Sequence, residues 1–311
     1  MPTALITGVA GFIGLNLAEA LLDRGYEVRG VDTFVTGRRA NIESFRDHPE
    51  FTFREVDIRD GEALESAMRG TDIVFHQAAA VSVEGSVKDP ITTSDTNCVG
   101  TATVLDAARR VDVDTVVVAS SAALYGSSGD LPKVESMPSA PESPYGLSKQ
   151  YTEELAIQAS ELYELDTVAL RYFNVFGPRQ DPHGEYAAVI PAFINRLLDG
   201  EQPVIYGDGE QTRDFVFVED VVRANIAAAE SDVSATVCNI ARGAQTSINE
   251  LAETLIDLLA VDLEPIHDDP RPGDIRHSYA DISRARDRLG YEPQVSFRAG
   301  LERTIEYYQD R

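Results

Sequence analysis

Two residues in the stretch SPYGLSKQY (143–151) are suited to acid–base chemistry. Tyr145 and Lys149 are four positions apart, so they lie one turn apart on the same face if the segment is helical. A free tyrosine titrates near pH ~10, and a nearby ammonium group favours the phenolate. We therefore expect Lys149 and the N-terminus of this helix to lower the pKa of Tyr145, so that it takes a proton from an alcohol.

The rarity of lysine supports this interpretation. The chain has 27 Lys plus Arg, of which only three are lysine: Lys88, Lys133 and Lys149. Arginine is forked and permanently charged, whereas lysine is a compact charge that can approach both a phenolate and a ribose hydroxyl. The alternative is a solvated pair on an exposed helix, because YxxxK spacing is common by chance. A serine at the end of the apolar run TVVVASS, Ser121, favours catalysis, because its hydroxyl would donate to a substrate oxygen.

A glycine-rich segment, TGVAGFIG, follows the first apolar run and precedes a helical pattern. It places Gly8, Gly11 and Gly14 where a chain turns tightly, lets a pyrophosphate approach the backbone and packs a helix closely on a strand. The following helix would supply N–H groups and a positive dipole to phosphates. The spacing differs from the usual dinucleotide fingerprint, and a plain glycine turn is the alternative.

An acid stands where a dinucleotide ribose is expected. Asp32 ends the second apolar run, 18 residues after Gly14, and a carboxylate there binds ribose hydroxyls and disfavours a 2′-phosphate. We therefore predict NAD as the cofactor, although Arg38 and Arg39 nearby leave NADP open. A turn aspartate is the alternative role for Asp32.

These residues must be positioned by the elements around them, and the first half of the chain alternates short apolar runs with helical patterns. Such alternation predicts a parallel sheet built from βαβ units. The fold class is thus α/β, with a Rossmann-type doubly wound parallel sheet and a smaller, interleaved C-terminal α+β substrate domain. The predicted strands are 4–7, 27–32, 51–57, 72–79, 115–121 and 166–173; the predicted helices are 12–25, 62–70, 97–110 and 144–163.

The alternation becomes irregular after residue 174. We expect a dinucleotide-binding domain at 1–174, to which 207–241 returns, and a second, smaller domain at 175–206 and 242–311. In this second half the predicted helices are 188–200 and 247–260, with a strand and helix at 214–230 and a strand at 236–241.

Composition restricts the classes of function. The formal net charge of −25 disfavours binding to nucleic acid or to anionic membranes. Together with scarce lysine it suggests a halophilic protein, whose self-repulsion is screened by salt. No run of 18 apolar residues and no leader is seen, and the two cysteines form no metal motif, so we expect a cytoplasmic protein without a metal and with free thiols.

Ordered motifs along nearly the whole chain resemble the extended short-chain dehydrogenase/reductases, and specifically their nucleotide-sugar epimerase/dehydratase family. Within that family the chain looks most similar to 4-epimerases of UDP-N-acetylglucosamine and UDP-glucose. The motifs are TGVAGFIG, FHQAA, NCVGT, SPYGLSK, RYFNVFG, YGDGEQTRDFVFVEDV and RPGDIRHSYADIS.

The resemblance implies a role for individual residues. Ser121, Tyr145 and Lys149 would be the catalytic set, and the last two would also contact the cofactor. The other cofactor contacts would be Gly8, Gly11, Phe12, Ile13, Gly14, Asp32, Asp57, Ile58, Ala78, Ala79 and Asn97. The substrate contacts would be Ser82, Ser121, Asn174, Ala188, Val189, Tyr206, Arg213, Arg271, Asp274 and Ser278. The arginines in this set suit a diphosphate, because they are permanently charged and bidentate.

The family resemblance also implies a reaction. Dehydratases carry an Asp-Glu pair directly after the catalytic serine or threonine, whereas Ala122 and Ala123 stand here, and neither can act as acid or base. Epimerisation at C4 needs no further group and is the reaction that remains. A 4-keto sugar would form, turn about its diphosphate and be reduced from the other face, with NAD regenerated.

The choice of sugar depends on a gate position. Glucose-restricted members have a bulky tyrosine where Ser278 stands, and a serine leaves room for a 2-acetamido group. We therefore predict UDP-GlcNAc/UDP-GalNAc as the preferred pair, with UDP-glucose/UDP-galactose tolerated. The alternatives are a UDP-glucose-restricted 4-epimerase, a UDP-glucuronate 4-epimerase and a catalytically silent NAD-binding protein. Ser82 would replace a lysine that glucose-type members often carry.

Two further expectations concern histidines and assembly. His76 lies in an apolar run, which favours a satisfied core histidine over an acid–base role, and nothing assigns a proton to His183 or His277. The resemblance implies a homodimer formed through helices 97–110 and 144–163.

Overall fold

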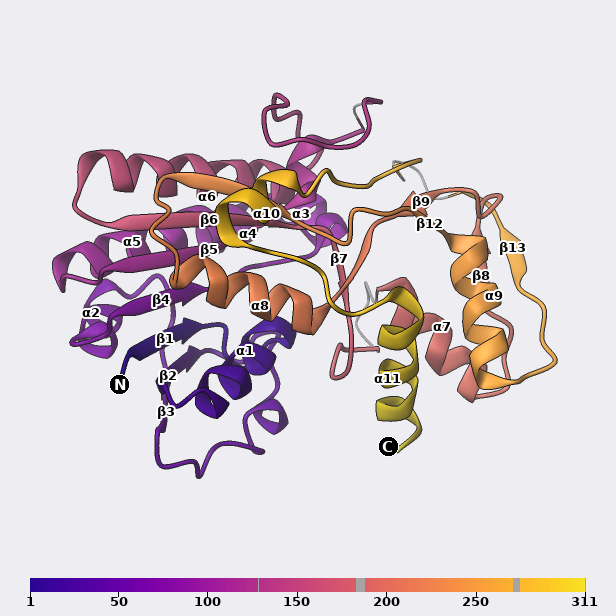
Figure 1. The fold of residues 1–311 in the computed structure, drawn as a ribbon, viewed down its shortest axis with the longest axis horizontal. Helices are drawn as coiled ribbons and strands as arrows, with labels where there is room; N and C mark the ends of the chain where they lie inside the picture. The colour runs from indigo at the N-terminus through magenta and orange to yellow at the C-terminus, as the bar shows by residue number, and fades with distance from the viewer. Residues whose placement is uncertain (128, 183–187, 271–274, 311) are drawn as a thin grey trace.

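A parallel sheet organises the computed structural model, which describes residues 1–127, 129–182, 188–270 and 275–310 (Figure 1). Within these residues the sheet has seven strands in the order β11-β6-β5-β4-β1-β2-β3, and every neighbouring pair is parallel. The order runs outward from β1 in both directions, so the doubly wound Rossmann prediction is confirmed. The strands are β1 (Thr3–Thr7), β2 (Glu27–Asp32), β3 (Phe51–Glu55), β4 (Ile73–His76), β5 (Thr115–Ser121), β6 (Asp166–Tyr172) and β11 (Thr236–Ile240).

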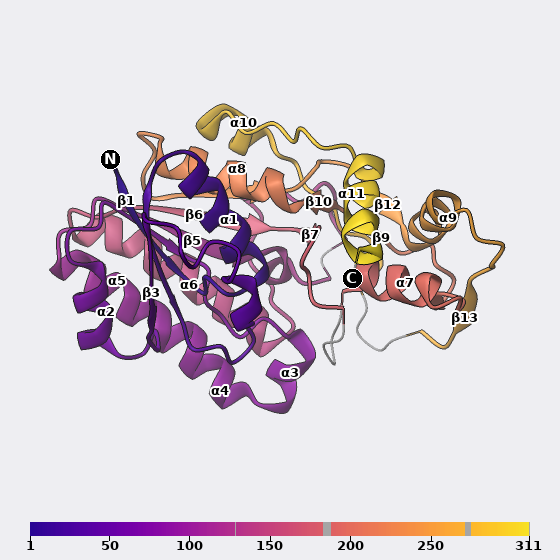
Figure 2. The ribbon, with the colours of Figure 1, turned by 90° about the horizontal axis from the view of Figure 1, so that it is seen from below.

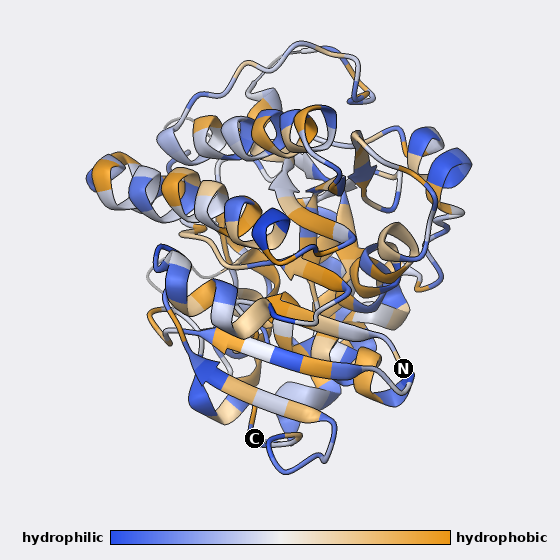
Figure 3. Ribbon diagram, turned by 90° about the vertical axis from the view of Figure 1, so that its left-hand side faces the viewer, coloured by the Kyte–Doolittle hydropathy of each residue, from blue (hydrophilic) through white to orange (hydrophobic). Residues whose placement is uncertain are grey.

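Helices cover both faces of the sheet, which is why its central strands are mostly apolar on both sides (Figures 2 and 3). Alternate residues of β5 point to opposite cores: Val116 and Val118 to one, Val117 and Ala119 to the other. The first core lies under α2 (Gly61–Met68), α5 (Gly100–Arg110) and α6 (Pro144–Leu162), and the second lies under α1 (Phe12–Asp23) and α8 (Val218–Ala229).

A third core lies beyond the carboxyl edge of the sheet. It gathers apolar side chains of short strand pairs and helices, among them Phe176, Phe193, Phe217, Leu251 and Leu301. The strand pairs are β7 (Asn174–Phe176) with β10 (Phe215–Phe217), β8 (Val204–Tyr206) with β13 (Ile266–Asp268), and β9 (Thr212–Arg213) with β12 (Thr246–Ser247). The helices are α7 (Val189–Leu198), α9 (Ile248–Leu259) and α11 (Phe297–Gln309).

The chain passes between these parts more than once. β11 and α8 return to the sheet, and α10 (Ser283–Leu289) packs beside β11 with Ile282 and Tyr291 in the core of the α1/α8 face. Within the segment 207–241, which was expected to return to the sheet, Phe215 and Phe217 pack in the third core. The interleaving agrees with the expected arrangement, while the domain boundaries at 174, 206 and 241 stay a prediction.

Short helices that the sequence analysis did not predict lie beside α6. They are α3 (Val83–Lys88), α4 (Pro90–Ser94), the π-helical turn η2 (Asp95–Val99) and the 3-10 turn η3 (Ala122–Tyr125). The predicted helix 97–110 therefore begins inside η2 and continues as α5. A further 3-10 turn, η1 (Arg39–Asn41), lies near the glycine loop, where Asn41 donates to the Ala10 carbonyl (2.7 Å). Among the described residues, none of the helices combines the length and the apolar character that a membrane span requires.

One buried carboxylate joins the sheet to the rest of the chain. Asp214 is fully buried and accepts hydrogen bonds from the backbone N–H groups of Arg242 (2.8 Å), Gly243 (3.0 Å), Ala244 (3.2 Å) and Ala280 (3.3 Å). It thus holds the turn after β11 and the segment before α10 against the start of β10. Buried donors of this kind are costly when they lose their acceptor.

We expect Asp214→Asn to lower the free energy of unfolding by ~2–4 kcal/mol, because an amide has one acceptor atom and turns N–H donors toward the backbone donors. Chemical denaturation measures the change. Asp257→Asn is the matched control: Asp257 is exposed and pairs only at the surface with Arg298 (2.8 Å), so its loss costs under ~1 kcal/mol. Equal effects of the two substitutions would contradict the role given to Asp214.

Candidate active site

The N-terminus of α6 carries the predicted catalytic pair. Ser143 caps the helix, accepting from the Gly146 N–H (3.0 Å), and Pro144 fills the first helical position, where its missing N–H is not needed. Tyr145 and Lys149 then point to the same side, over the carboxyl end of β5. The predicted helix at 144–163, with Tyr145 and Lys149 on the same face, is confirmed.

Three side chains meet at this end of β5. Ser121 is the last residue of the strand, and its hydroxyl accepts from the Ala123 N–H (3.2 Å) and lies near enough to the phenol of Tyr145 to favour the phenolate. Lys149 Nζ lies 5.9 Å from the centre of the Tyr145 ring and donates to the Ala119 carbonyl (2.8 Å). Both α6 residues are at least nine-tenths buried. The structure therefore brings Ser121, Tyr145 and Lys149 together.

The expected decrease in the pKa of Tyr145 is wrong for the protein alone. Burial raises the pKa of this phenol, because an uncharged ring loses less than a phenolate when water is excluded, and the hydrogen bond from Ser121 offsets only part of that effect. The Lys149 ammonium is directed at a backbone carbonyl. In the protein alone Tyr145 is therefore a phenol at neutral pH.

Burial also acts on Lys149. It lowers the pKa of this ammonium to about 8, against the charge of Glu153, which favours the protonated form. An ordinary lysine titrates near pH ~10.4. Lys149 is therefore a cation at neutral pH that changes charge within reach of physiological conditions.

The glycine loop meets the sheet where the strand order reverses. Gly8 has a φ of +71°, and a Cβ on Gly14 would lie 2.2 Å from the Gly8 carbonyl oxygen, so only glycine fits at these two positions. Gly11 precedes α1, whose first turn has neither a side-chain cap nor an acid, so the N–H groups of Phe12, Ile13 and Gly14 face outward for an anion. These residues fit a dinucleotide pyrophosphate.

The residues near Asp32 fit NAD better than NADP. Asp32 is half-buried and accepts from the N–H groups of Ala10 (2.9 Å) and Phe34 (2.7 Å), which leaves further lone pairs for hydroxyl groups. Arg38 pairs with Asp181 (2.6 Å), and Arg39 pairs with Glu55 (2.7 Å) and lies over the Phe34 ring. Both arginines that left NADP open are therefore already paired with acids.

Two of the predicted cofactor contacts, Asp57 and Ile58, lie next to each other along the chain but in different surroundings. Ile58 is buried against Gly100, where a Cβ would meet its side chain at 2.5 Å. Asp57 accepts from both the backbone and the guanidinium of Arg59, which holds the pKa of its carboxyl below the ordinary range. Arg59 also pairs with Asp95 (2.5 Å).

Asn97 holds the segment that follows β4. Its amide accepts from the Ala80 N–H (2.7 Å) and donates to the Ala80 carbonyl (3.0 Å) and to Ser148 on α6 (2.9 Å). This fixes Ala79 and Ala78, and a Cβ on Gly8 would lie 2.8 Å from the Ala78 nitrogen. Asn97 lies in η2, and π-turns of this kind often occur at functional sites.

His76 is a satisfied core histidine, as expected. Its ring contacts the Thr7 hydroxyl at 2.8 Å and the Thr101 hydroxyl at 3.1 Å, and burial together with the charge of Lys149 lowers its pKa to about 3. It stays neutral. His277 contacts the Thr212 hydroxyl (3.1 Å), and His183 lies outside the described residues.

Four predicted substrate contacts lie along one connected stretch. The Asn174 N–H donates to the Asp214 carbonyl (3.0 Å), next to Arg213, and the Ser278 N–H donates to the Thr212 carbonyl (3.1 Å). Gln211 donates to the Tyr206 carbonyl (2.8 Å). β7, β8, β9 and the segment before residue 280 thus place Asn174, Tyr206, Arg213 and Ser278 near one another.

The remaining predicted substrate contacts are less closely placed. Ala188 and Val189 are at the start of α7, and the Ser82 hydroxyl caps α3 by accepting from the Gly85 N–H (2.8 Å). Arg271 and Asp274 lie outside the described residues. Among the described residues there is no cluster of three or more metal-ligating side chains, and Cys98 and Cys238 are free thiols.

The sequence analysis missed two charged residues beside the catalytic pair. Glu153 and Arg171 form a buried ion pair, with Arg171 Nε 2.7 Å from Glu153 Oε1, one turn beyond Lys149 on α6. The available signals were the spacing Tyr145, Lys149, Glu153 at successive turns and an arginine at the end of an apolar strand. Neither signal shows that the two meet.

Comparison with known proteins gives relatives along the whole chain. The model of the NAD dependent epimerase/dehydratase family matches residues 4–241. A putative UDP-glucose 4-epimerase of Methanocaldococcus jannaschii is 39% identical over 308 residues, which are 98% of each chain. The solved UDP-N-acetylglucosamine 4-epimerase of Methanobrevibacter ruminantium M1, in complex with UDP-N-acetylmuramic acid, has a TM-score of 0.96 and 40% identity, covering 99% of this chain and 98% of its own.

A further solved structure contains the cofactor. The UDP-glucuronic acid 4-epimerase of Bacillus cereus, in complex with UDP-glucuronic acid and NAD, has a TM-score of 0.91 and 32% identity, covering 99% of each chain. The glycine loop, Asp32 and the Ser121–Tyr145–Lys149 group agree with such a cofactor. The chain belongs to the NAD dependent epimerase/dehydratase family, and its cofactor is NAD.

Proposed function

We propose that the protein is an NAD-dependent 4-epimerase of UDP-hexoses. The observation that carries this proposal is the meeting of Ser121, Tyr145 and Lys149 at the carboxyl edge of the sheet, directly followed by Ala122 and Ala123 in η3. Alanines supply no second acid or base for elimination or decarboxylation. Oxidation and reduction at one carbon is the chemistry that this set of side chains supports.

The residues divide the reaction between them. Ser121 donates a hydrogen bond to the oxygen on C4, and Tyr145 accepts the proton of that hydroxyl. Lys149 stabilises the resulting phenolate. NAD, which the glycine loop and Asp32 would hold, would supply the hydride acceptor and donor for C4 and a positive nicotinamide ring that favours the phenolate. Tyr145 then returns the proton to the sugar oxygen.

The preferred substrate in this proposal is UDP-GlcNAc/UDP-GalNAc, with UDP-glucose/UDP-galactose tolerated. Ser278 is partly exposed, and its backbone is held against Thr212 beside Arg213, the position expected for a wall of the hexose pocket. A serine there leaves space for an acetamido group. The solved UDP-N-acetylglucosamine 4-epimerase is among the most similar structures, which supports the same choice.

Two other substrates remain alternatives. A UDP-glucose 4-epimerase is favoured by the name of the relative from Methanocaldococcus jannaschii, and a UDP-glucuronate 4-epimerase by the structure from Bacillus cereus. The second alternative needs a cationic partner for the C6 carboxylate. A silent NAD-binding protein is the least supported, because Tyr145 and Lys149 are both present.

We further propose a homodimer in a salt-rich cytoplasm. Exposed apolar side chains gather on α6 and on the short helices beside it: Val87, Ile91, Val99, Leu147 and Tyr151 are 41–80% exposed. A second copy of the chain would cover such a surface. The charge of −25 suits a medium in which salt screens self-repulsion.

Proton NMR of purified protein with UDP-GlcNAc or UDP-glucose, without added reductant and in high salt, tests the proposed reaction. We expect UDP-GalNAc to appear from UDP-GlcNAc, and UDP-galactose to appear more slowly from UDP-glucose. Conversion of UDP-glucose alone would keep the reaction and contradict the role of Ser278. Conversion of neither would contradict the proposed substrates.

The gate itself is tested by Ser278→Tyr. The added ring should reduce kcat/KM for UDP-GlcNAc by ~10²-fold or more and leave that for UDP-glucose within ~5-fold, because only the acetamido group needs the space. The control is Ser139→Tyr, which adds a tyrosine on the half-exposed loop before α6. A parallel loss for both sugars would show that Ser278 is not selective.

Tyr145→Phe should reduce kcat by ~10³-fold or more while NAD still binds, because the ring remains and only the proton acceptor is removed. Tyr163→Phe, just beyond the same helix and exposed, is the matched control and should retain activity. Turnover by Tyr145→Phe within ~10-fold of the unmodified protein would exclude Tyr145 as the base.

A further inference from the structure

A row of polar side chains crosses three strands behind the catalytic group. Ser120 of β5 is directly opposite Arg171 of β6, and Arg171 is directly opposite Asn239 of β11. Residues in such a row share one face of the sheet, here the face covered by α6. All three side chains are at least 95% buried. A buried polar row of this kind needs partners for every polar atom.

Glu153 of α6 supplies the central acceptor. Its carboxylate accepts from the Ser120 hydroxyl (2.5 Å) and takes two parallel bonds from Arg171, at 2.7 and 2.8 Å. Arg171 also donates to the Tyr125 hydroxyl (2.7 Å), which donates to Asn239 (2.7 Å). Bidentate pairs in a dry site have a fixed geometry as well as a fixed charge.

This arrangement ties three successive residues of β5 to three successive turns of α6. Ser121 contacts Tyr145, the Ala119 carbonyl accepts from Lys149, and Ser120 donates to Glu153. Moving Glu153 would therefore move the strand end that carries Ser121. Because Glu153 and Lys149 are one turn apart, it also places a negative charge beside the buried ammonium.

The charged and titratable groups around Lys149 are few. His76 of β4 is neutral, the Cys98 thiol of η2 is kept protonated because burial raises its pKa, and Tyr145 is a phenol in the resting protein. Among the described residues, the charged side chain that acts on the lysine is Glu153, which Arg171 holds by two hydrogen bonds. Burial alone would lower the pKa of Lys149 further than the value of about 8 that it keeps, because Glu153 acts in the opposite direction.

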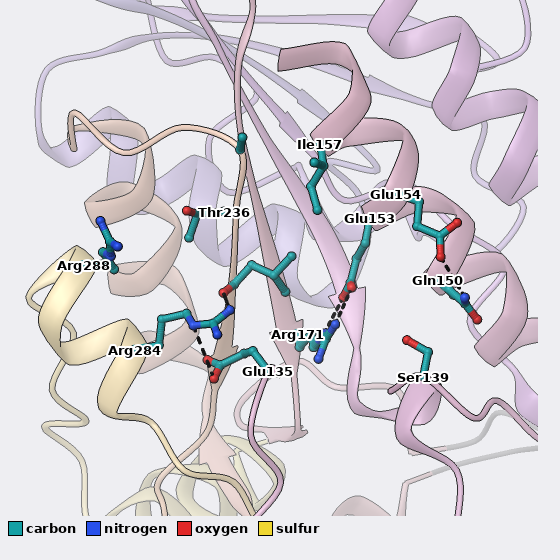
Figure 4. Close-up of a pocket in the computed structure, with 12 residues that line it drawn as sticks. Glu135, Ser139, Gln150, Glu153, Glu154, Ile157, Arg171, Thr236, Arg284 and Arg288 are labelled. Atoms are coloured by element: carbon teal, nitrogen blue, oxygen red, sulfur yellow. Dashed lines mark hydrogen bonds and ion pairs between the residues drawn. The ribbon is translucent and has the colours of Figure 1, made fainter. Parts of the chain in front are cut away.

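The ion pair borders a second cavity, not the catalytic one (Figure 4). This pocket of about 440 Å³ is lined by Glu153 and Arg171 on one side and by Glu135 and Arg284 on the other. Figure 4 shows Glu153 reaching from α6 to Arg171 on β6, with their two bonds parallel. Lys149 is not among the lining residues. The pair therefore stands between the buried lysine and this pocket.

We propose that Glu153, held by Arg171, is a positioning residue of the reaction: it keeps Lys149 charged at the pH at which Tyr145 accepts its proton, and it fixes the end of β5 that carries Ser121. Arg171 partly compensates the negative charge that Lys149 experiences. The pH at which Lys149 titrates therefore lies between the value expected without Glu153 and the value expected with Glu153 but without Arg171. The proposal rests on Tyr145 as the base of the proposed function, but its central effect is on Lys149 and is measurable without turnover.

The three lysines make the charge of Lys149 directly observable. Protein labelled with ¹³C at lysine Cε gives three lysine signals, and the signal lost in Lys149→Met identifies the one of interest. Its chemical shift is followed against pH in Glu153→Gln, in Arg171→Met and in the double variant. The alkaline limb of kcat is measured in the same proteins.

We expect the two single substitutions to act in opposite directions. In Glu153→Gln the nearby anion is lost and the Arg171 cation remains, so Lys149 should titrate about one pH unit lower. In Arg171→Met the anion is no longer compensated, so Lys149 should titrate about one unit higher. The double variant should lie between the two, and the alkaline limb of kcat should move with the lysine.

Glu154→Gln is the matched control, since Glu154 is the next residue, lines the same pocket and bonds only to Gln150 on its own helix (2.8 Å). It should leave the titration unchanged. If the titration of Lys149 shifted in the same direction in both single variants, or did not shift, the pair would have only a structural role and the proposal would be overturned. If Glu153→Gln does not fold, Arg171→Met and the double variant still give the direction in which the titration of Lys149 shifts.

A wild-type protein that turns over no UDP-hexose would refute the proposed function and leave the lysine titration interpretable.

Discussion

The site depends on keeping one ammonium group charged in a nearly dry position. Lys149 is only 5% exposed and has a carbonyl, a neutral histidine and a protonated thiol around it, none of which replaces bulk water as a solvent for a cation. A buried charge of this kind persists only where the fold supplies opposing charge and fixed dipoles. The Glu153–Arg171 pair and the carboxyl end of β5 provide these, so the catalytic geometry and the polar interior of α6 form one system.

The parallel sheet brings the parts of this system together from distant segments. The carboxyl ends of β1, β4 and β5 lie at the same edge, so the glycine loop, Ala78 and Ser121 meet although more than 100 residues separate the first from the last. The reversal of strand order beside β1 opens this edge to a dinucleotide. Asn97 then joins the β4 edge to α6 through Ala80 and Ser148, which aligns the cofactor side of the site with the catalytic side.

Much of this was accessible from sequence because it is local. Strand and helix periodicity located the sheet to within a few residues, and the capped start of α6 and the spacing of Tyr145 and Lys149 needed no tertiary information. The predicted direction of the pKa shift of Tyr145 was wrong, because burial raises this pKa and burial is a property of the whole fold. The Glu153–Arg171 pair was missed because it depends on the register that sets Ser120 opposite Arg171. The strands of the third core are two or three residues long, too short for a pattern, and they form through long-range packing. Helix α11 was missed although Phe297, Leu301 and Ile305 recur every four residues.

The division between a shared catalytic edge and a variable sugar pocket follows from the same geometry. Tyr145, Lys149 and Glu153 are fixed by a continuous helix against a central strand, where a shift of one residue would expose the whole core face. Asn174, Tyr206, Arg213 and Ser278 lie instead on two- and three-residue strands and on loops, whose side chains contact few neighbours in the sheet. Substitutions there change the pocket without disturbing the buried charge. The similar solved enzymes are named for different UDP-sugars, which agrees with a sugar pocket built on elements separate from the buried charge.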